Sequence, residues 1–487
     1  MRAWTRTKSR VAIVGVGVLS VVGVMAVAGS GAAPGVVGAR SLGHSATHAG
    51  VAKIAIRPML ISRRASVGQP PTSADCVAAF TVPCYDAAQI QTAYDEQPLF
   101  AHGINGRGKT IVIVDSFGSP TITADLATFD SELGLPAPPS FKIITPAGPI
   151  PPYDPTDANG DVDWAGETTL DVEWSHVIAP GANILLVETP VSETEGTAGF
   201  PQIVEAENYV INHHLGDVIS QSFGATEESF PNAQSLLALR SAYFNAFLHH
   251  VTVLAASGDA GSTDYTDPSA TDLFTHPVTS WPPSDPLVTG VGGTQLQLDA
   301  NGNRTAPDQV WNDTFNTSLN EVFFGDDGPN ALAGGGGKSV VFPRPWYQNG
   351  VARVTGRHRG VPDVSMSGAC SGLVDAYQSF DGSGGPGWYV YCGTSEATPM
   401  FAGIVAMADQ VAHHSLGLIN PALYALSAHH ASGLVDITTG NNTVAFTQNS
   451  TLYTVPGFSA GPGYDLASGV GTVDAARFVP ELAFTAR

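Results

Sequence analysis

A serine with the surroundings of a nucleophile stands in the segment Trp388-Tyr-Val-Tyr-Cys-Gly-Thr-Ser-Glu-Ala-Thr-Pro-Met-Phe-Ala-Gly-Ile-Val405. A strand-like run ends at Cys392, Gly393 permits a sharp turn, and an apolar helix begins at Ser395. Free N–H groups and the dipole at a helix N-terminus favour negative charge, which suits a nucleophile whose reaction builds an oxyanion. Taken alone, the pattern also fits a serine that only caps a packed helix.

Two carboxylates, Glu167 and Asp171, lie four residues apart in a segment with helical character at 167–178. Residues at that spacing project from one face of a helix, where like charges repel each other. One interpretation is a solvated acidic face. The other is a general base oriented by a second carboxylate, which is an arrangement that activates a hydroxyl nucleophile.

A third carboxylate, Asp259, lies in the glycine-flanked turn Ala255-Ala-Ser-Gly-Asp-Ala-Gly261, directly after an expected strand. In doubly wound sheets, turns at the carboxyl ends of the strands face the binding crevice. Asp259 is therefore a candidate site residue, although aspartate–glycine turns are common.

The elements that must position these residues alternate between strand and helix. We expect strands at 110–115, 183–188, 217–222 and 251–256, and helices at 87–101, 167–178, 201–214 and 232–249. This alternation predicts an α/β fold with a doubly wound, mostly parallel sheet flanked by helices. A hairpin turn is expected at 299–303, and 304–335 is expected to be mostly loop.

In their order, these motifs resemble the sedolisins, the serine-carboxyl peptidases with a subtilisin-like fold. The motifs are Glu-x-x-x-Asp at 167–171, Ser-Gly-Asp-x-Gly at 257–261 and Gly-Thr-Ser-x-x-x-Pro at 393–399. Matching stretches also occur at 173–182, 220–224, 291–294, 344–348 and 359–363. The resemblance covers nearly all of the chain after its N-terminal segment, so we expect one large catalytic domain at 85–487.

The resemblance implies acyl transfer by an endopeptidase that acts on proteins or peptides. Ser395 is the implied nucleophile, Glu167 the general base and Asp171 the carboxylate behind it. Asp259, with the Ser395 backbone N–H, is implied to stabilise the oxyanion. A glutamate base and a protonated aspartate donor both favour acid, so we expect a maximum at roughly pH 3 to 5.

The resemblance also implies one structural calcium ion near the C-terminus. The sequence matches the Asp-Ile and Gly-x-Gly-x-Asp elements of that site with Asp436, Ile437, Gly461, Gly463 and Asp465. Carboxylate and carbonyl oxygens suit this hard cation. Ordinary glycine turns are the alternative interpretation.

Two further interpretations stay open from the sequence. A subtilisin-like triad would use Asp115, at the end of the first strand, and His176 with Ser395, although His176 lacks the His-Gly-Thr context of that family. The other is a non-catalytic secreted binding module on the same fold. The intact set of candidate catalytic residues argues against this second alternative.

The N-terminus has the layout of a secretory signal, in which basic residues precede an apolar run at 11–28 and small residues follow. We therefore expect a signal peptide at 1–28 and a secreted, extracellular protein. The apolar run is long, so the chain would contact a membrane if this segment stayed uncleaved. Residues 29–84 are expected to be a linker or vestigial propeptide, much shorter than the folded prodomain usual in sedolisins.

The charge of the chain bears on its binding partners, and its cysteines bear on its disulfides. Lysine and arginine total 21 against 43 acidic residues, and the net charge of −22 argues against binding to nucleic acid. We expect a monomer with disulfides between Cys76 and Cys84 and between Cys370 and Cys392, because each pair is close in sequence. The glycines at 334–337 lack the spacing of a phosphate loop, which excludes a nucleotide site there.

Overall fold

The computed structural model describes residues 57–58, 61–66, 68–156, 160–191, 199–266 and 272–486. All of them belong to one structural unit, Gly50–Arg487. The expected signal peptide at 1–28 lies outside the described residues, and so does 29–56. In the part of the chain that is described, no helix is both long and apolar enough to span a membrane.

An eight-stranded sheet forms the centre of this unit, with the strand order β12-β11-β9-β7-β4-β6-β5 and with β15 paired to β11. All neighbouring strands are parallel except β12, which runs antiparallel to β11. The strands are β4 Thr110–Ser116, β5 Phe141–Ile144, β6 Asn183–Thr189, β7 Val218–Gln221, β9 Thr252–Ala256, β11 Thr289–Gln295, β12 Gln309–Val310 and β15 Val364–Ser367. The predicted α/β fold with a mostly parallel sheet is confirmed, and the strand order reverses beside β4.

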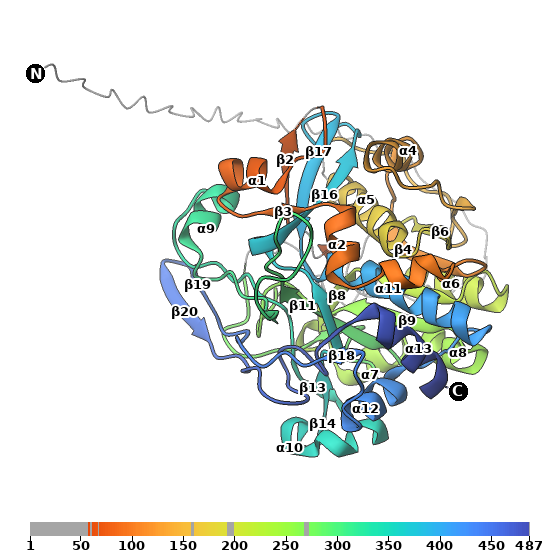
Figure 1. Cartoon of the computed structure of the whole chain (residues 1–487). Helices are drawn as coiled ribbons and strands as arrows, with labels where there is room; N and C mark the ends of the chain where they lie inside the picture. Colours follow the sequence, from red (N-terminus) through yellow and green to blue (C-terminus); the bar gives the residue numbers. More distant parts are fainter. Residues whose placement is uncertain are drawn as a thin grey trace, which may run out of the picture. The chain divides into compact units, whose positions relative to one another are not determined.

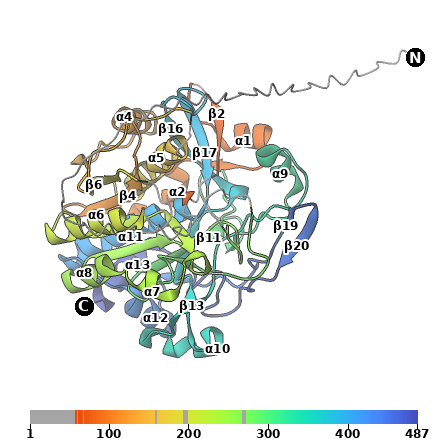
Figure 2. The same cartoon turned by 180° about the vertical axis from the view of Figure 1, so that it is seen from behind.

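Helices cover both faces of the sheet. Along β4, Ile111 and Ile113 join one buried cluster while Val112 and Val114 join another, because successive side chains of a strand point to opposite faces. The first cluster contains α5 (Asp161–Ile178), α11 (Thr394–Ala412) and α13 (Ala475–Thr485), and the second contains α6 (Phe200–Asn212) and α8 (Ser241–His249). Figure 1 is seen from the side of α11 and α13, and Figure 2 from the side of α6 and α8.

Helices α5 and α11 pack directly against each other, which brings two of the predicted motifs together. Gly403 of α11 faces Ile178, the last residue of α5. A Cβ added to Gly403 would come within 2.7 Å of Ile178 Cβ. This close approach requires glycine, because any side chain at position 403 would force the helices apart. Toward the starts of the same helices lie Glu167 and Ser395.

A second sheet, with the order β2-β17-β16-β3, leads into the nucleophile segment. Its strands are β2 Ile61–Ser66, β3 Cys84–Tyr85, β16 Leu373–Gln378 and β17 Gly387–Cys392. Both predicted disulfides are confirmed, and the bond between Cys370 and Cys392 ties down the end of β17. The four described cysteines are therefore all paired.

Part of the segment expected to be a linker or vestigial propeptide is built into this second sheet. Strand β2 pairs antiparallel with β17, beside it in both views (Figures 1 and 2). Arg63 donates to the Phe323 carbonyl, and Arg64 donates to the carbonyls of Gly384 and Pro386. The helix α1 (Ser73–Phe80) follows. The basic residues break the apolar alternation by which a strand is recognised in a sequence.

Three other sequence expectations differ from the structure in detail. The expected helix at 87–101 is two helices, α2 (Ala87–Ala93) and α3 (Gln97–Ala101), because Asp95 adopts a φ of 58° between them. The expected helix at 232–249 is divided into α7 (Ala233–Leu237) and α8. The expected loop contains β12 and a helix, α9 (Thr317–Phe324), whose N-cap is Asn316. The hairpin turn is confirmed by a hydrogen bond from Asp299 N to Asn303 O of 2.9 Å.

Small sheets and short helices complete the described part. The remaining strands are β1 Arg57–Pro58, β8 Phe223–Thr226, β10 Ser280–Trp281, β13 Gly337–Pro343, β14 His358–Val361, β18 Leu434–Val435, β19 Val444–Gln448, β20 Thr451–Val455 and β21 Thr472–Val473. The remaining α-helices are α4 Ile122–Leu133, α10 Ala352–Thr355 and α12 Asn420–Ala428.

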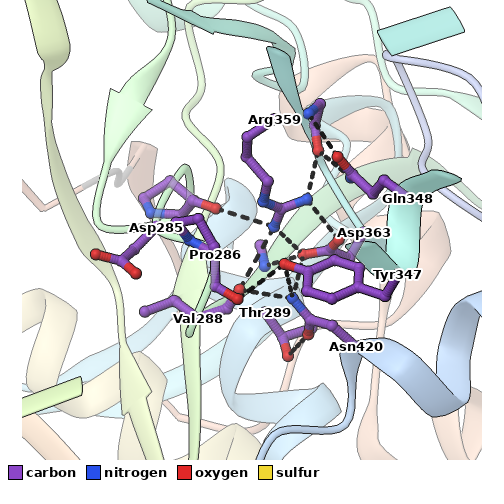
Figure 3. A network of polar contacts seen from close by, with 12 residues as sticks. Asp285, Pro286, Val288, Thr289, Tyr347, Gln348, Arg359, Asp363 and Asn420 are labelled. Atoms are coloured by element: carbon purple, nitrogen blue, oxygen red, sulfur yellow. Dashed lines mark hydrogen bonds and ion pairs between the residues drawn. The ribbon is translucent and has the colours of Figure 1, made fainter. Parts of the chain in front are cut away.

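A buried ion pair between Arg359 and Asp363 fixes the start of β15 (Figure 3). Asp363 also accepts a hydrogen bond of 2.8 Å from the backbone N–H of Gly290 in β11. Strand β15 then leads to Gly368, whose carbonyl accepts the N–H of Gly393 at 2.9 Å. The motif at 359–363 therefore helps to position the turn before Ser395.

Other polar groups surround this pair and hydrogen-bond to it or to the residues beside it (Figure 3). Gln348 donates to the Gly360 carbonyl at 2.8 Å and accepts the Gly360 N–H at 3.0 Å. The Tyr424 hydroxyl donates to Asp363 at 2.8 Å, and the Asn420 amide donates to the Val288 carbonyl at 2.9 Å. Buried charges need such partners, because leaving one unpaired costs several kcal/mol.

Candidate active site

Three candidate site residues lie at the carboxyl ends of β4, β7 and β9, which are neighbours in the central sheet. Asp115 lies near the end of β4, Ser222 directly follows β7, and Asp259 comes shortly after β9. This edge of the sheet lies at the reversal of strand order, where α/β proteins bind ligands. Helices α5 and α11 add Glu167 and Ser395 to the same place.

Ser395 is the second residue of helix α11. The helix is preceded by Gly393 with a φ of 136°, which is in the region that favours glycine. The Ser395 hydroxyl lies 3.4 Å from the Ser222 carbonyl and interacts with the Glu167 carboxyl. The side chain is fully buried. The predicted nucleophile and the predicted base are therefore neighbours.

Glu167 is fully buried on the face of α5 that meets α11. Burial raises its pKa well above the usual value, and the charge of Asp171 adds to this effect. The nearby Ser395 hydroxyl opposes this shift. Among the described residues, neither Glu167 carboxyl oxygen has a hydrogen-bond partner, and the Ser395 hydroxyl donates to the Ser222 carbonyl instead. The charges of Asp115 and Asp259 raise the pKa of Glu167 further.

Asp171 is also fully buried and accepts a hydrogen bond of 2.8 Å from the Ser222 hydroxyl. Burial raises the pKa of Asp171 well above its usual value, as does the charge of Asp115, while the Ser222 hydroxyl lowers it. Glu167 and Asp171 are therefore neighbouring carboxyls that are both fully buried. The solvated acidic face that the sequence left open is excluded by their burial.

Asp115 belongs to the same carboxyl cluster, which the sequence indicated only as part of an alternative triad. Burial raises the pKa of Asp115 to about 7, while the Thr168 hydroxyl lowers it and the charge of Glu188 raises it. The position of Asp115 at the end of β4, the strand beside which the sheet order reverses, is the sequence signal that points to this place. Ser222 lies in the matching stretch at 220–224, but no role was expected for it from the sequence.

Asp259 meets the start of α11 through Thr394. The Thr394 N–H and hydroxyl donate to Asp259 Oδ1 at 2.7 Å and 2.8 Å. Asp259 Oδ2 has no hydrogen-bond partner among the described residues. Burial raises the pKa of Asp259 to about 8, against the two Thr394 hydrogen bonds, which lower it. Asp259 is thus protonated at acidic pH with one oxygen free, as an oxyanion donor requires.

His176 lies away from Ser395, so the structure does not assemble the alternative triad. It comes nine positions after Glu167 on α5, which is two and a half turns and therefore the opposite face of the helix. Its Nε2 lies 2.7 Å from the Pro136 carbonyl and 3.3 Å from Asp130 Oδ1. The sequence interpretation that used Asp115 and His176 with Ser395 is wrong for this reason.

The N-terminal strands lie along the two strands that border the site. In β1, Arg57 pairs with Gly224 of β8, the strand that begins directly after Ser222. In β2, Ile61 pairs with Cys392, three residues before Ser395. A pocket of about 270 Å³ lies between β2, the first turns of α5 and the hairpin of β16 and β17. Gly166, next to Glu167, is part of its wall.

Four of the five residues of the predicted calcium site are joined by hydrogen bonds at one glycine loop. The carboxylate of Asp436 accepts the Gly463 N–H at 2.9 Å, and that of Asp465 accepts the Gly461 N–H at 3.0 Å. Ile437, beside Asp436, is buried. Within the described ranges no group of three or more His, Cys, Asp or Glu side chains forms a metal site, so an ion here would also need carbonyl oxygens. Both carboxylates accept N–H groups of the loop at 461–463, and Asp465 also accepts those of Ala467 and Ser468 at 2.9 Å. Carboxylate and carbonyl oxygens are ligands that suit a hard cation.

Comparisons with known proteins show which sequences and structures the chain resembles. The model of the subtilase family (Peptidase_S8) matches residues 160–452. Kumamolisin from Bacillus sp. (strain MN-32) is 31% identical over 85% of this chain and 66% of its own length. Sedolisin from Pseudomonas sp. (strain 101) is 26% identical over 83% of this chain and 62% of its own length. The chain thus spans slightly less than two thirds of each relative.

A solved structure of the same Pseudomonas protein family is also similar to this chain. The structure of Pseudomonas sedolisin, described as a serine-carboxyl proteinase complexed with two molecules of pseudo-iodotyrostatin, superimposes with a TM-score of 0.66. The match is 25% identical and covers 83% of this chain and all of that one. Human tripeptidyl-peptidase 1 is 28% identical over 63% of this chain and 50% of its own length.

Proposed function

Because the chain belongs to the sedolisin family, within the subtilases, we propose that it is a secreted endopeptidase that hydrolyses peptide bonds in acid through a Ser395 acyl-enzyme. One observation carries the proposal. The Ser395 hydroxyl, at the N-terminus of helix α11, lies close to the buried Glu167 carboxyl of α5, and the residue before it binds Asp259. A base, a nucleophile and an oxyanion donor are thereby within reach of one reacting carbonyl.

In the first half of the reaction, Glu167 accepts the Ser395 proton while Ser395 Oγ attacks the peptide carbonyl carbon. Asp171 orients Glu167 and, when neutral, leaves the negative charge of the pair on the base. The carbonyl oxygen becomes an oxyanion, to which protonated Asp259 and the Ser395 N–H donate. Glu167 then gives its proton to the leaving amine, the C–N bond breaks, and the acyl group remains on Ser395.

In the second half, water replaces the amine. Glu167 accepts a proton from water, whose oxygen attacks the acyl carbon and forms a second oxyanion at the same donors. Collapse of this intermediate breaks the bond to Ser395 Oγ, which recovers its proton from Glu167. Each residue therefore returns to its starting protonation state after one peptide bond has been hydrolysed.

The test of this proposal is peptide hydrolysis by the purified chain at about pH 4, where a glutamate base and an aspartate donor are expected to work. A peptide aldehyde should block the reaction, because it forms a hemiacetal with an activated serine. A non-catalytic binding module, the other function that the sequence left open, would neither hydrolyse peptides nor react with the aldehyde.

The N-terminal segment is proposed to act as a short propeptide. Peptides commonly bind by adding a strand to an exposed sheet edge, and β1 and β2 pair with β8 and β17 in that manner. In the structure, which contains these strands, the carboxyls of Glu167 and Asp259 are buried and their pKa values are raised. Removal of the segment would return water to the site and lower these values toward acid.

We therefore expect the full chain to show a lag before hydrolysis at acidic pH, and a chain that starts at residue 68 to show none. Removing β2 also removes its hydrogen bonds to β17, so the melting temperature is measured as a control. Equal progress curves from two folded chains, or an inactive chain that needs a separately added prodomain, would contradict this role.

A bound calcium ion is proposed at the loop held by Asp436 and Asp465. Metal that binds only the folded state stabilises it by about 2.7 kcal/mol when the free ion is a hundredfold above its dissociation constant. A chelator should therefore lower the melting temperature, and Asp465→Ala should remove that difference. Asp154→Ala, at a position outside this loop, should keep it. An identical melt with and without chelator would argue against the ion.

A further inference from the structure

Thr394, the residue before Ser395, donates two hydrogen bonds to one oxygen of Asp259. Its N–H and its hydroxyl both donate to Asp259 Oδ1, at 2.7 Å and 2.8 Å. The Thr394 hydroxyl in turn accepts the N–H of Gly258 at 3.1 Å. Thr394 is fully buried, so water does not compete for these bonds.

The donor and the acceptor can be assigned in each of these three hydrogen bonds. A backbone N–H can only donate, so the Thr394 N–H donates to Asp259 Oδ1 and the Thr394 hydroxyl accepts from Gly258. The hydroxyl proton is directed to Asp259 Oδ1, the acceptor at 2.8 Å. Asp259 Oδ1 thereby accepts two hydrogen bonds from Thr394. Asp259 Oδ2 has no partner within the residues that the structure describes. The proton of a neutral Asp259 therefore belongs on Oδ2.

We propose that Thr394 is a positioning residue that holds the Asp259 proton on Oδ2, where it is donated to the oxyanion. The inference rests on the proposed function, because it gives Thr394 a role in the same reaction. A donor that is already oriented stabilises developing charge without reorganising during the reaction. Without the Thr394 hydroxyl, the proton would be shared between the two oxygens and would often point away from the oxyanion.

The ionisable groups around Asp259 are all acidic. They are Asp264 in the segment after β9, Glu167 on α5 and Glu396 on α11. The charge of Asp264 raises the pKa of Asp259. The charge of Asp259 raises the pKa values of Glu167 and Glu396. No cation forms an ion pair with Asp259 in the described parts of the chain. The Thr394 hydrogen bonds are thus the main interactions that favour the ionised form.

The test is Thr394→Val, which keeps the side-chain shape and removes the hydroxyl. We expect kcat in acid to fall about tenfold with little change in KM, the size of one net hydrogen bond. The alkaline limb of the pH profile should move to higher pH, because the lost bond no longer lowers the pKa of Asp259. Thr394→Ser should restore both. Thr398→Val, whose hydroxyl bonds only the Thr394 carbonyl at 2.7 Å, should leave the limb in place.

A second variant keeps the inference testable if Thr394→Val fails to fold. In Asp259→Asn, the Thr394 donors should hold the amide oxygen at the Oδ1 position and aim the NH₂ group at the oxyanion. Asp259→Asn should then retain at least tenfold more activity than Asp259→Ala and lose the alkaline limb. Equal activity of the two variants would overturn the inference.

The inference and the proposed function fail in different ways. An unaltered chain without Ser395-dependent hydrolysis contradicts the proposed function. Ser395-dependent hydrolysis that Thr394→Val leaves unchanged, or a limb that moves to lower pH, contradicts only the role of Thr394. A lower melting temperature with an unchanged pH profile would also overturn it, since a purely structural residue would behave in that way.

Discussion

Replacing Ser395 by alanine is expected to lower kcat/KM for peptide hydrolysis by roughly 10⁴-fold or more, and Glu167→Gln is expected to do the same. The two residues act as one unit, because the Glu167 carboxyl interacts with the Ser395 hydroxyl that it has to deprotonate. The double variant should therefore be no slower than either single variant. Glutamine keeps the shape of Glu167 and removes only its basicity, so the loss can be assigned to chemistry.

His176→Ala supplies the matched control for these variants. The histidine is buried on the same helix as Glu167 but contacts Pro136 and Asp130 on the far side from Ser395. Its loss should lower the melting temperature and leave the acidic pH profile intact. Initial rates at several pH values, normalised to the folded fraction, provide the measurement. The kcat of Asp259→Ala should lie between those of the Ser395 and His176 variants, with a loss of about 10² to 10³-fold.

Two results would refute this assignment. A Ser395→Ala chain that keeps a tenth of the normal rate would place the nucleophile elsewhere. A His176→Ala chain that folds normally and loses hydrolysis would require a histidine mechanism, for which the structure offers no contact between His176 and Ser395 in its described residues.

The parts of the fold that sequence reasoning predicted correctly are those with a local signal. The strand at Thr110–Ser116 is a short apolar run, and the nucleophile turn carries a glycine whose φ of 136° explains its presence. The pair Glu167 and Asp171 is recognisable because four residues bring two side chains to one face of a helix. Motif order then linked these pieces to a family.

The features that were missed depend on contacts between distant segments. Strand β2 forms because β17 offers it a free edge, and its arginines find carbonyl acceptors at Gly384 and Pro386 far along the chain. The approach of Asp115 to Glu167 is set by the packing of α5 on β4. Neither arrangement leaves a periodic pattern in the sequence. The same applies to the hydroxyl of Thr394, whose role depends on where Asp259 lies.

Stability should fall steeply as the pH rises from acid to weakly alkaline values, because the chain buries many carboxyl groups without cations. Burial raises the pKa of Glu207 on α6 to about 8. It also raises the pKa of Glu96, Glu173, Asp375 and Asp409 well above their usual values. None of these groups forms an ion pair within the described residues.

The sign of the effect follows from the direction in which burial moves these pKa values. A carboxyl whose pKa is higher in the folded state binds its proton more tightly there, so the folded state gains stability wherever that proton is bound. The gain is complete below the unfolded value of about 4.3 and is lost as the pH passes the folded value, which is about 8 for Glu207. A tenfold difference in proton affinity between the two states corresponds to about 1.4 kcal/mol, so a few such groups lower the stability by several kcal/mol.

We therefore expect the melting temperature to be highest near pH 4 to 5 and to drop by many degrees at about pH 8. Glu207→Gln tests the cause, since it removes one titrating group, the carboxyl on α6 to which Gln221 donates. Its melting temperature should depend less on pH, with the gain concentrated above pH 7. Glu205→Gln, on an exposed position of the same helix, should follow the unaltered chain. A melting temperature that stays level or rises between pH 5 and pH 8 would mean that these carboxyls do not control the stability of the fold.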